Sequence, residues 1–224
     1  MAKRRKQLSR GATVAVAARP RRRQKQKPEP ASQRRVTSHH EAGHIVVAWR
    51  LGYLPKSVTI VPGDGYRGRA KFENPLHRMK RGVDPDSSNL DRPEGARMMQ
   101  LIEHAAIISL AGPVAVKRFN PRSHRHVGGG ASPGKLVSKD SDYQQVLDLI
   151  YRVYGNGKVH DIYWRYVEAR AEALVEKHWK VVKRLASALV KRETMITRQE
   201  ILEVLNEGQP PILLRNHGGL AESA

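Results

Sequence analysis

The feature that most constrains this chain is the segment TSHHEAGHIVVAWRLG, residues 37–52. Its apolar residues recur at the spacing of a buried helix face, and Gly52 is a typical stop signal. The segment therefore predicts a helix that begins near Val36. On such a helix His40 and His44 are four residues apart and lie on the same face. Two imidazoles at that spacing can bind one Zn²⁺ ion from the same side.

Glu41 follows the first of these histidines, in the pattern H-E-x-x-H. A carboxylate there can reach a water held by a metal ion and accept its proton, which is the chemistry of a hydrolase. A structural interpretation competes with this one, because Ser38-x-x-Glu41 has the spacing of a helix capping box. Gly43 argues against it, since glycine inside a helix costs about 1 kcal/mol relative to alanine. We therefore expect something to approach the helix closely at Gly43, and we favour the metal site.

Spacing alone leaves the third ligand open. The chain has no cysteine, which excludes thiolate ligands. The extended motif of the metzincins needs Gly and His where this chain has Val47 and Arg50, so that class is excluded too. The remaining candidates are acidic or imidazole side chains further along the chain: Glu103, His104, His124, His126, Asp140 and Asp142. Asp142 follows Ser141, which begins a helix-capping pattern with Gln144, so its acid could simply balance a helix dipole.

Helical periodicity dominates the rest of the sequence. It predicts helices over about 93–110, 141–155, 160–192 and 197–205, with 111–119 either continuing the first or beginning another, and a short strand pair within 57–72. The predicted fold class is therefore mainly α with a small β element (α+β). The strand near 66–72, if it lies at a sheet edge, could pair with a peptide, although an ordinary hairpin explains the same residues.

Charge and composition divide the chain into three parts. The formal net charge is +20, and residues 1–35 hold thirteen Lys or Arg but one acid, Glu29. We interpret 1–35 as a disordered basic tail, 36–207 as one folded domain, and 208–224 as a flexible C-terminal tail. The basic tail either solubilises the protein or binds nucleic acid or an anionic surface. The second interpretation gives an alternative function: a nucleic-acid-associated protein whose HEAGH motif is structural or degenerate.

Five blocks of the sequence resemble the peptidase domain of the FtsH family of ATP-dependent zinc metalloproteases. In family order they are HHEAGHIVVAWRLG (39–52), SVTIVPGDGYRGRA (57–70), AAIISLAGPVAVKRF (105–119), KDSDYQQVLDLI (139–150) and LASALVKRETMITRQEILEVL (185–205). The resemblance implies a zincin-like helical metallopeptidase domain over 36–207. It also implies that His40, His44 and Asp142 hold Zn²⁺ while Glu41 activates the water, with Asp140 as the nearest rival to Asp142.

The activity implied by the resemblance is that of a metalloendopeptidase acting on unfolded or extended polypeptides. The family's usual Glu after the AG-x-x-A pattern is Val116 here, so any role of that acid is lost. The transmembrane helices and ATPase module of the family have no counterpart, and GGASPGKL (129–136) has Leu136 where a phosphate-binding loop needs Ser or Thr. We therefore expect a stand-alone cytoplasmic peptidase, without a transmembrane segment, whose partner is a separate ATPase or an adaptor.

Overall fold

The computed structural model describes residues 31–63, 65–78, 93–122 and 141–207 of the 224-residue chain. Its elements are α1 (Ala31–Arg50), β1 (Pro55–Thr59), β2 (Arg69–Phe72), the 3-10 helix η1 (Pro75–Arg78), α2 (Pro93–Phe119), α3 (Asp142–Tyr154), α4 (Lys158–Lys177), α5 (Trp179–Arg192), β3 (Thr194–Met195) and α6 (Arg198–Asn206). The predicted fold class is confirmed: the described chain is mainly helical, with a small antiparallel sheet of order β2-β1-β3. The predicted C-terminal tail lies outside the described residues.

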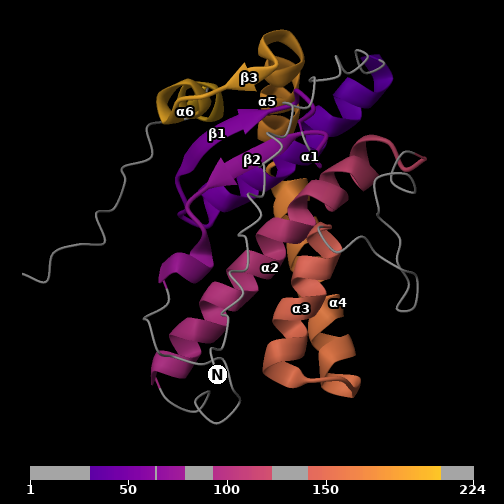
Figure 1. Cartoon of the computed structure of the whole chain (residues 1–224), viewed down its shortest axis with the longest axis vertical. Coiled ribbons are helices and arrows are strands. Elements are labelled where there is room, and N and C mark those ends of the chain that lie inside the picture. The colour runs from indigo at the N-terminus through magenta and orange to yellow at the C-terminus, as the bar shows by residue number, and fades with distance from the viewer. Residues whose placement is uncertain (1–30, 64, 79–92, 123–140, 208–224) are drawn as a thin grey trace, which may run out of the picture.

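The central element is α1, which packs against α2, α5 and the sheet (Figure 1). Ile45, Val46 and Ala48 are fully buried, as the sequence predicts, and so is Val47. A helix that is apolar all round must lie inside the protein rather than against its surface. The core therefore surrounds the C-terminal half of α1, and the histidine motif sits at the start of that buried half.

The start of α1 corrects one prediction. The helix begins at Ala31 and not near Val36, so residues 31–35 do not belong to the basic tail. The side chain of Arg34 lies 2.5 Å from the carboxylate of Glu193, at the end of α5. A charged first turn is thus held in place by a contact from the far end of the domain, which a local reading of composition does not reveal. The remainder of the predicted tail, residues 1–30, lies outside the described residues.

The capping-box interpretation of Ser38 and Glu41 is also wrong. Ser38 lies inside α1, and its hydroxyl donates to the carbonyl oxygen of Arg35 at 2.8 Å. A residue in the third turn of a helix has no free backbone donors to cap. Glu41 is therefore available for another role.

The predicted close approach at Gly43 is confirmed, and the neighbour is α2. A Cβ atom at Gly43 would lie 2.5 Å from the carbonyl oxygen of Ala111 and 2.9 Å from the Cβ of Ala115. The two helices can cross at this distance only because position 43 has no side chain. The helix α2 continues through Pro113 to Phe119, so residues 111–119 extend it rather than form another helix.

The helix α2 is also the one element with the length and composition of a membrane span among the described residues. The stretch is Gly95–Phe119, and 72% of its most apolar window is buried inside the protein. It packs against α1, α3 and α4. This is the pattern of a helix at the centre of a core.

The sheet covers α1 and places β2 at its edge. The predicted strand pair is confirmed, with Val58 opposite Ala70 and Thr59 opposite Arg69. Val58 faces the core and is 1% exposed. The strand β3 was not predicted, because two residues carry no periodic signal.

Two details of the C-terminal half bear on the predicted helices. The segment predicted over 160–192 is divided at His178, which separates α4 from α5 with φ −108° and ψ 18°. The apolar spacing continues across this break, so the sequence pattern does not show it. The predicted capping box of the last helix is confirmed: Thr197 accepts from the backbone N–H of Glu200, whose carboxylate bonds back to Thr197.

Candidate metal centre

The two histidines of the motif face one another on α1. The Nε2 atoms of His40 and His44 lie 3.1 Å apart, and the two rings meet edge to face. The side chain of His44 is 8% exposed and that of His40 is 15% exposed. The i, i+4 spacing thus produces the convergence predicted from the sequence.

Asp142 completes the group from a different helix. The hydroxyl of Ser141 accepts a hydrogen bond from the backbone N–H of Gln144, and this cap begins α3 at Asp142. The Oδ2 atom of Asp142 lies 3.0 Å from Nε2 of His40 and 3.5 Å from Nε2 of His44. A residue about one hundred positions away in the sequence is therefore brought against the histidine pair, as the resemblance implies.

The spacing of these three atoms suits one metal ion. His40, His44 and Asp142 are the group of possible ligands that the described residues bring together, with one ligand atom from each within 4.8 Å of the others. An ion with tetrahedral bonds of about 2.0–2.1 Å keeps neighbouring ligand atoms roughly 3.3–3.4 Å apart. The separations of 3.1, 3.0 and 3.5 Å are close to that value. Three protein ligands leave one tetrahedral position for water or substrate.

The orientation of His44 is fixed by α2. Its Nδ1–H donates to the carbonyl oxygen of Ile108 at 2.7 Å, which turns Nε2 towards Asp142. Gly112 makes room for the ring, because a Cβ at that position would overlap Nε2 of His44. The other ring has no such bond: Nδ1 of His40 is buried and has no hydrogen-bond partner among the described residues. The contact that the structure gives His40 is at its other nitrogen, Nε2, which lies 3.0 Å from Asp142.

Glu41 lies between the ligand group and the sheet edge. Its side chain is buried, and the backbone N–H of Ala70 in β2 donates a hydrogen bond to its carboxylate. Gly68 lies just before β2, and a Cβ there would be 2.7 Å from Oε1 of Glu41. The carboxylate is thus enclosed by α1 on one side and by the edge of β2 on the other.

The protein's own charges couple these groups strongly. Burial raises the pKa of Glu41 above its usual range, although His40 and His44 act in the opposite direction. Burial acts to lower the pKa of His44, but the carboxylate of Asp142 outweighs it and raises that pKa to about 9. Burial acts to raise the pKa of Asp142, yet the charge of His44 and hydrogen bonds from both imidazoles hold it well below its usual range. A protonated His44 and the carboxylate of Asp142 can thus form a buried ion pair. A metal ion must displace that proton to bind the three ligands.

The other predicted candidates for the third metal ligand either bond to other residues or lie outside the described residues. Glu103 accepts a hydrogen bond from the hydroxyl of Tyr166 at 3.0 Å. His104 shares a hydrogen bond of 2.9 Å with the hydroxyl of Tyr53. Three further candidates lie outside the described residues: His124, His126 and Asp140.

Four backbone contributions to the site were not predicted. They are the carbonyl of Ile108, the space at Gly68 and Gly112, and the N–H of Ala70. A glycine next to a proline inside an apolar helix, as at Gly112, was the one sequence signal that could have found part of this set. Backbone groups otherwise carry no signal of their own in a sequence. Compared with known proteins, the chain matches no protein-family model and no curated protein.

Proposed function

We propose that this chain is a zinc-dependent metalloendopeptidase with a zincin-like fold of the FtsH peptidase type. The single observation that carries the proposal is the convergence of His40, His44 and Asp142 beside Glu41. Two imidazoles and one carboxylate with a vacant fourth position form a typical catalytic zinc set. The resemblance of the five sequence blocks supports the same assignment.

Each residue of the site would have its own role in peptide hydrolysis. A zinc ion, when bound, would supply a Lewis acid that polarises the scissile carbonyl and makes water more acidic. His40, His44 and Asp142 would hold it. Glu41 would accept the proton of the attacking water and later pass it to the leaving amine. Burial suits Glu41 to this role, because its raised pKa makes it a stronger base than an exposed glutamate.

The edge of β2 offers a place for the substrate chain. Ala70 lies opposite Val58, yet its N–H bonds to Glu41 and so points away from β1, towards the outer edge of the sheet. No described strand pairs with that edge. An extended polypeptide added there as a further strand would run past Glu41. This favours unfolded or extended chains as substrates, since a folded protein does not present a free strand.

The proposal is tested by metal analysis and a cleavage assay on the same preparations. We expect about one zinc per purified chain and cleavage of unfolded casein by the wild type. Glu41→Gln should keep the zinc and lower the cleavage rate by about 10²–10⁴-fold, because it removes the proton acceptor but no ligand. Glu103→Gln is the matched control: it makes the same change at a glutamate that bonds to Tyr166, and should retain both zinc and activity.

Two outcomes would contradict the proposal. A wild-type chain with neither zinc nor cleavage, even after zinc is added, would remove the peptidase function and leave a buried ion-pair network. Cleavage by Glu41→Gln at the wild-type rate would show that Glu41 is not the base. The separate ATPase or adaptor and the anionic partner of the basic tail stay predictions.

A further inference from the structure

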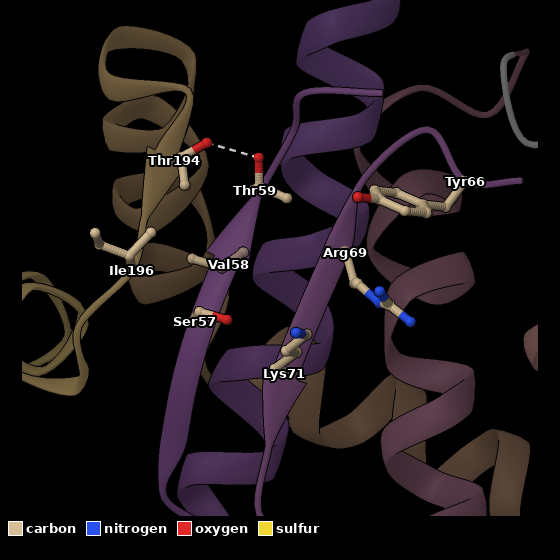
Figure 2. Close-up of a pocket in the computed structure, with 8 residues that line it drawn as sticks. All are labelled: Ser57, Val58, Thr59, Tyr66, Arg69, Lys71, Thr194 and Ile196. Carbon is tan, nitrogen blue, oxygen red and sulfur yellow. Dashed lines mark hydrogen bonds between the residues drawn. The ribbon is translucent and has the colours of Figure 1, made fainter. Parts of the chain in front are cut away.

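The outer face of the sheet carries a shallow pocket of about 150 Å³ beside the proposed substrate edge. Figure 2 shows its lining: Ser57, Val58, Thr59, Tyr66, Arg69, Lys71, Thr194 and Ile196. None of these eight residues is acidic, and the two cations both belong to the edge strand β2. The pocket therefore has a positive side, and that side is next to the free edge.

The two cations are arranged by the sheet register. Arg69 lies opposite Thr59, and Lys71 lies opposite Ser57, so each cation begins a row that runs across the sheet. Ala70 between them belongs to the other face, because successive side chains alternate along a strand. Arg69 and Lys71 are thus two residues apart with side chains on the same, outer face (Figure 2).

Neither cation has an acidic partner among the described residues. Other arginines near the sheet are paired: Arg78 lies 2.8 Å from the carboxylate of Glu73, and Arg198 lies 3.8 Å from it. Arg69 instead lies over the ring of Tyr66, with 5.1 Å between its guanidinium carbon and the ring centroid. That contact holds the cation close to the sheet. The free charge of the pocket is thus supplied by Arg69 and Lys71.

A strand added at the edge of β2 would continue both rows. Its residues opposite Arg69 and Lys71 would be two apart and would face outward, while the residue between them would face Glu41 and α1. Opposite charges in directly facing positions of neighbouring strands attract, and like charges repel. The row positions of a bound chain should therefore favour Asp or Glu and disfavour Lys or Arg.

We propose that the preferred substrates are polypeptides with acidic residues at alternate positions, of the form acid-x-acid, read by Arg69 and Lys71. This inference rests on the proposed function, because it assumes that the cleaved chain lies along β2. The pocket's hydroxyl groups lie further across the sheet than the two cations: Thr59 and Thr194 bond to one another at 2.7 Å and face the same pocket (Figure 2).

A simpler explanation of the cations is that charges on an edge strand prevent sheets from associating. That role needs charge of either sign and no alternation in a partner. The acid-x-acid proposal needs positive charge and needs both acids on the same face of the bound strand. The two explanations therefore predict different effects of charge reversal and of the spacing between the acids in a peptide.

The test uses zinc-loaded full-length protein and fluorogenic peptides of one length. One peptide carries two Glu two residues apart, a second carries them three residues apart, and a third carries Gln in their place. We expect kcat/KM for the first to exceed that for the third by about tenfold. The second should gain only about threefold, because acids three apart face opposite sides of a strand. The preference should weaken at high salt.

Charge reversal supplies the decisive variant. Arg69→Glu/Lys71→Glu should lose the preference for acids and cleave a Lys-x-Lys peptide about tenfold better than the acidic one. The matched control is Lys158→Glu/Arg165→Glu, which makes the same charge change on exposed residues of α4 that do not line the pocket, and should keep the wild-type preference.

The outcomes separate this proposal from the peptidase function. Equal cleavage of the Glu and Gln peptides by the wild type would overturn the acidic preference and leave the peptidase intact. If no peptide is cleaved, binding of labelled peptides to the Glu41→Gln chain, followed by fluorescence anisotropy, still decides. Tighter binding of the acid-x-acid peptide that is lost on charge reversal supports the acidic surface, and equal binding of all three peptides overturns it.

Discussion

The two halves of the metal centre are built in different ways. The histidine half lies at the crossing of α1 and α2, where Ile108 holds His44 and where Gly112 leaves space for its ring. The aspartate half lies at the first residue of α3, which is capped by Ser141 and packs against α2 and α4. The side chain of His44 is 8% exposed, whereas that of Asp142 is 25% exposed. One half is thus part of the core, and the other is brought to it by a helix end.

This difference predicts that the histidine half is rigid and that the aspartate half responds to small changes. A change in the histidine half must disturb two packed helices, because close-packed interiors have little free space. A change in the aspartate half alters one charge or one hydrogen bond at the end of a helix. We therefore expect zinc binding to be most sensitive to the crossing, less so to the charge of Asp142, and least to its cap.

The largest effect is expected from Gly112→Ala. The added methyl would overlap Nε2 of His44, the atom that would bind the ion. The ring must move or the helices must separate, and overpacking of this kind costs about 1–3 kcal/mol. We expect zinc affinity to fall by at least about 100-fold, measured by competition with a chromogenic chelator, and the melting temperature to fall as well.

Gly43→Ala is the matched control at the same crossing. Its methyl would meet the backbone of Ala111 at 2.5 Å rather than the ring of His44. Both variants should lose stability, but the loss of zinc affinity relative to the loss of stability should be larger for Gly112→Ala. Wild-type zinc affinity in a folded Gly112→Ala chain would show that the crossing does not position His44.

The same contrast explains what could be predicted from the sequence. The histidine pair, Glu41 and the approach at Gly43 follow from local spacing and from the cost of glycine in a helix, so they were accessible. Asp142 was accessible only through resemblance, because no local pattern says which distant acid a fold will bring to a helix. The cap at Ser141, in contrast, was visible as a local pattern.

What the sequence did not reveal was tertiary. The early start of α1 is accompanied by a contact between Arg34 and Glu193. The hydrogen bond from Ala70 to Glu41 depends on a sheet that packs over α1. The strand β3 and the break at His178 are too short, or too well in phase with the surrounding pattern, to leave a periodic signal. In each case the deciding contact joins parts of the chain that no window of sequence contains together.

The second prediction concerns the charge of Asp142 in the aspartate half. Asp142→Asn keeps the shape of the side chain but replaces a carboxylate ligand with a neutral amide, which binds zinc less well. We expect zinc affinity to fall by roughly 100-fold, measured by the same chelator competition. Asp148→Asn is the control on the same helix, where the carboxylate accepts from Gln144 and is exposed, and it should bind zinc as the wild type does. Equal zinc affinity in wild type and Asp142→Asn would move the third ligand to another residue, with Asp140 the first to test.

The smallest effect is expected from the cap itself. Ser141→Ala removes the acceptor of the bond from the N–H of Gln144, and loss of such a cap costs about 1 kcal/mol. Part of that cost should appear in zinc binding, because the first turn of α3 must be formed for Asp142 to reach the histidines. If the whole cost falls on that turn, zinc affinity should decrease about fivefold.

Thr197→Ala gives the matched comparison for that cap. It removes the same kind of cap from α6, where Thr197 accepts from the N–H of Glu200 at 3.2 Å. Both variants should lower the melting temperature, Thr197→Ala by at least as much because its hydroxyl also donates to the Glu200 carboxylate at 2.9 Å, but only Ser141→Ala should weaken zinc binding. Equal zinc affinity in the two variants would mean that packing of α3 against α2, and not its cap, places Asp142. The aspartate half would then be as much a part of the core as the histidine half, and the contrast between them would disappear.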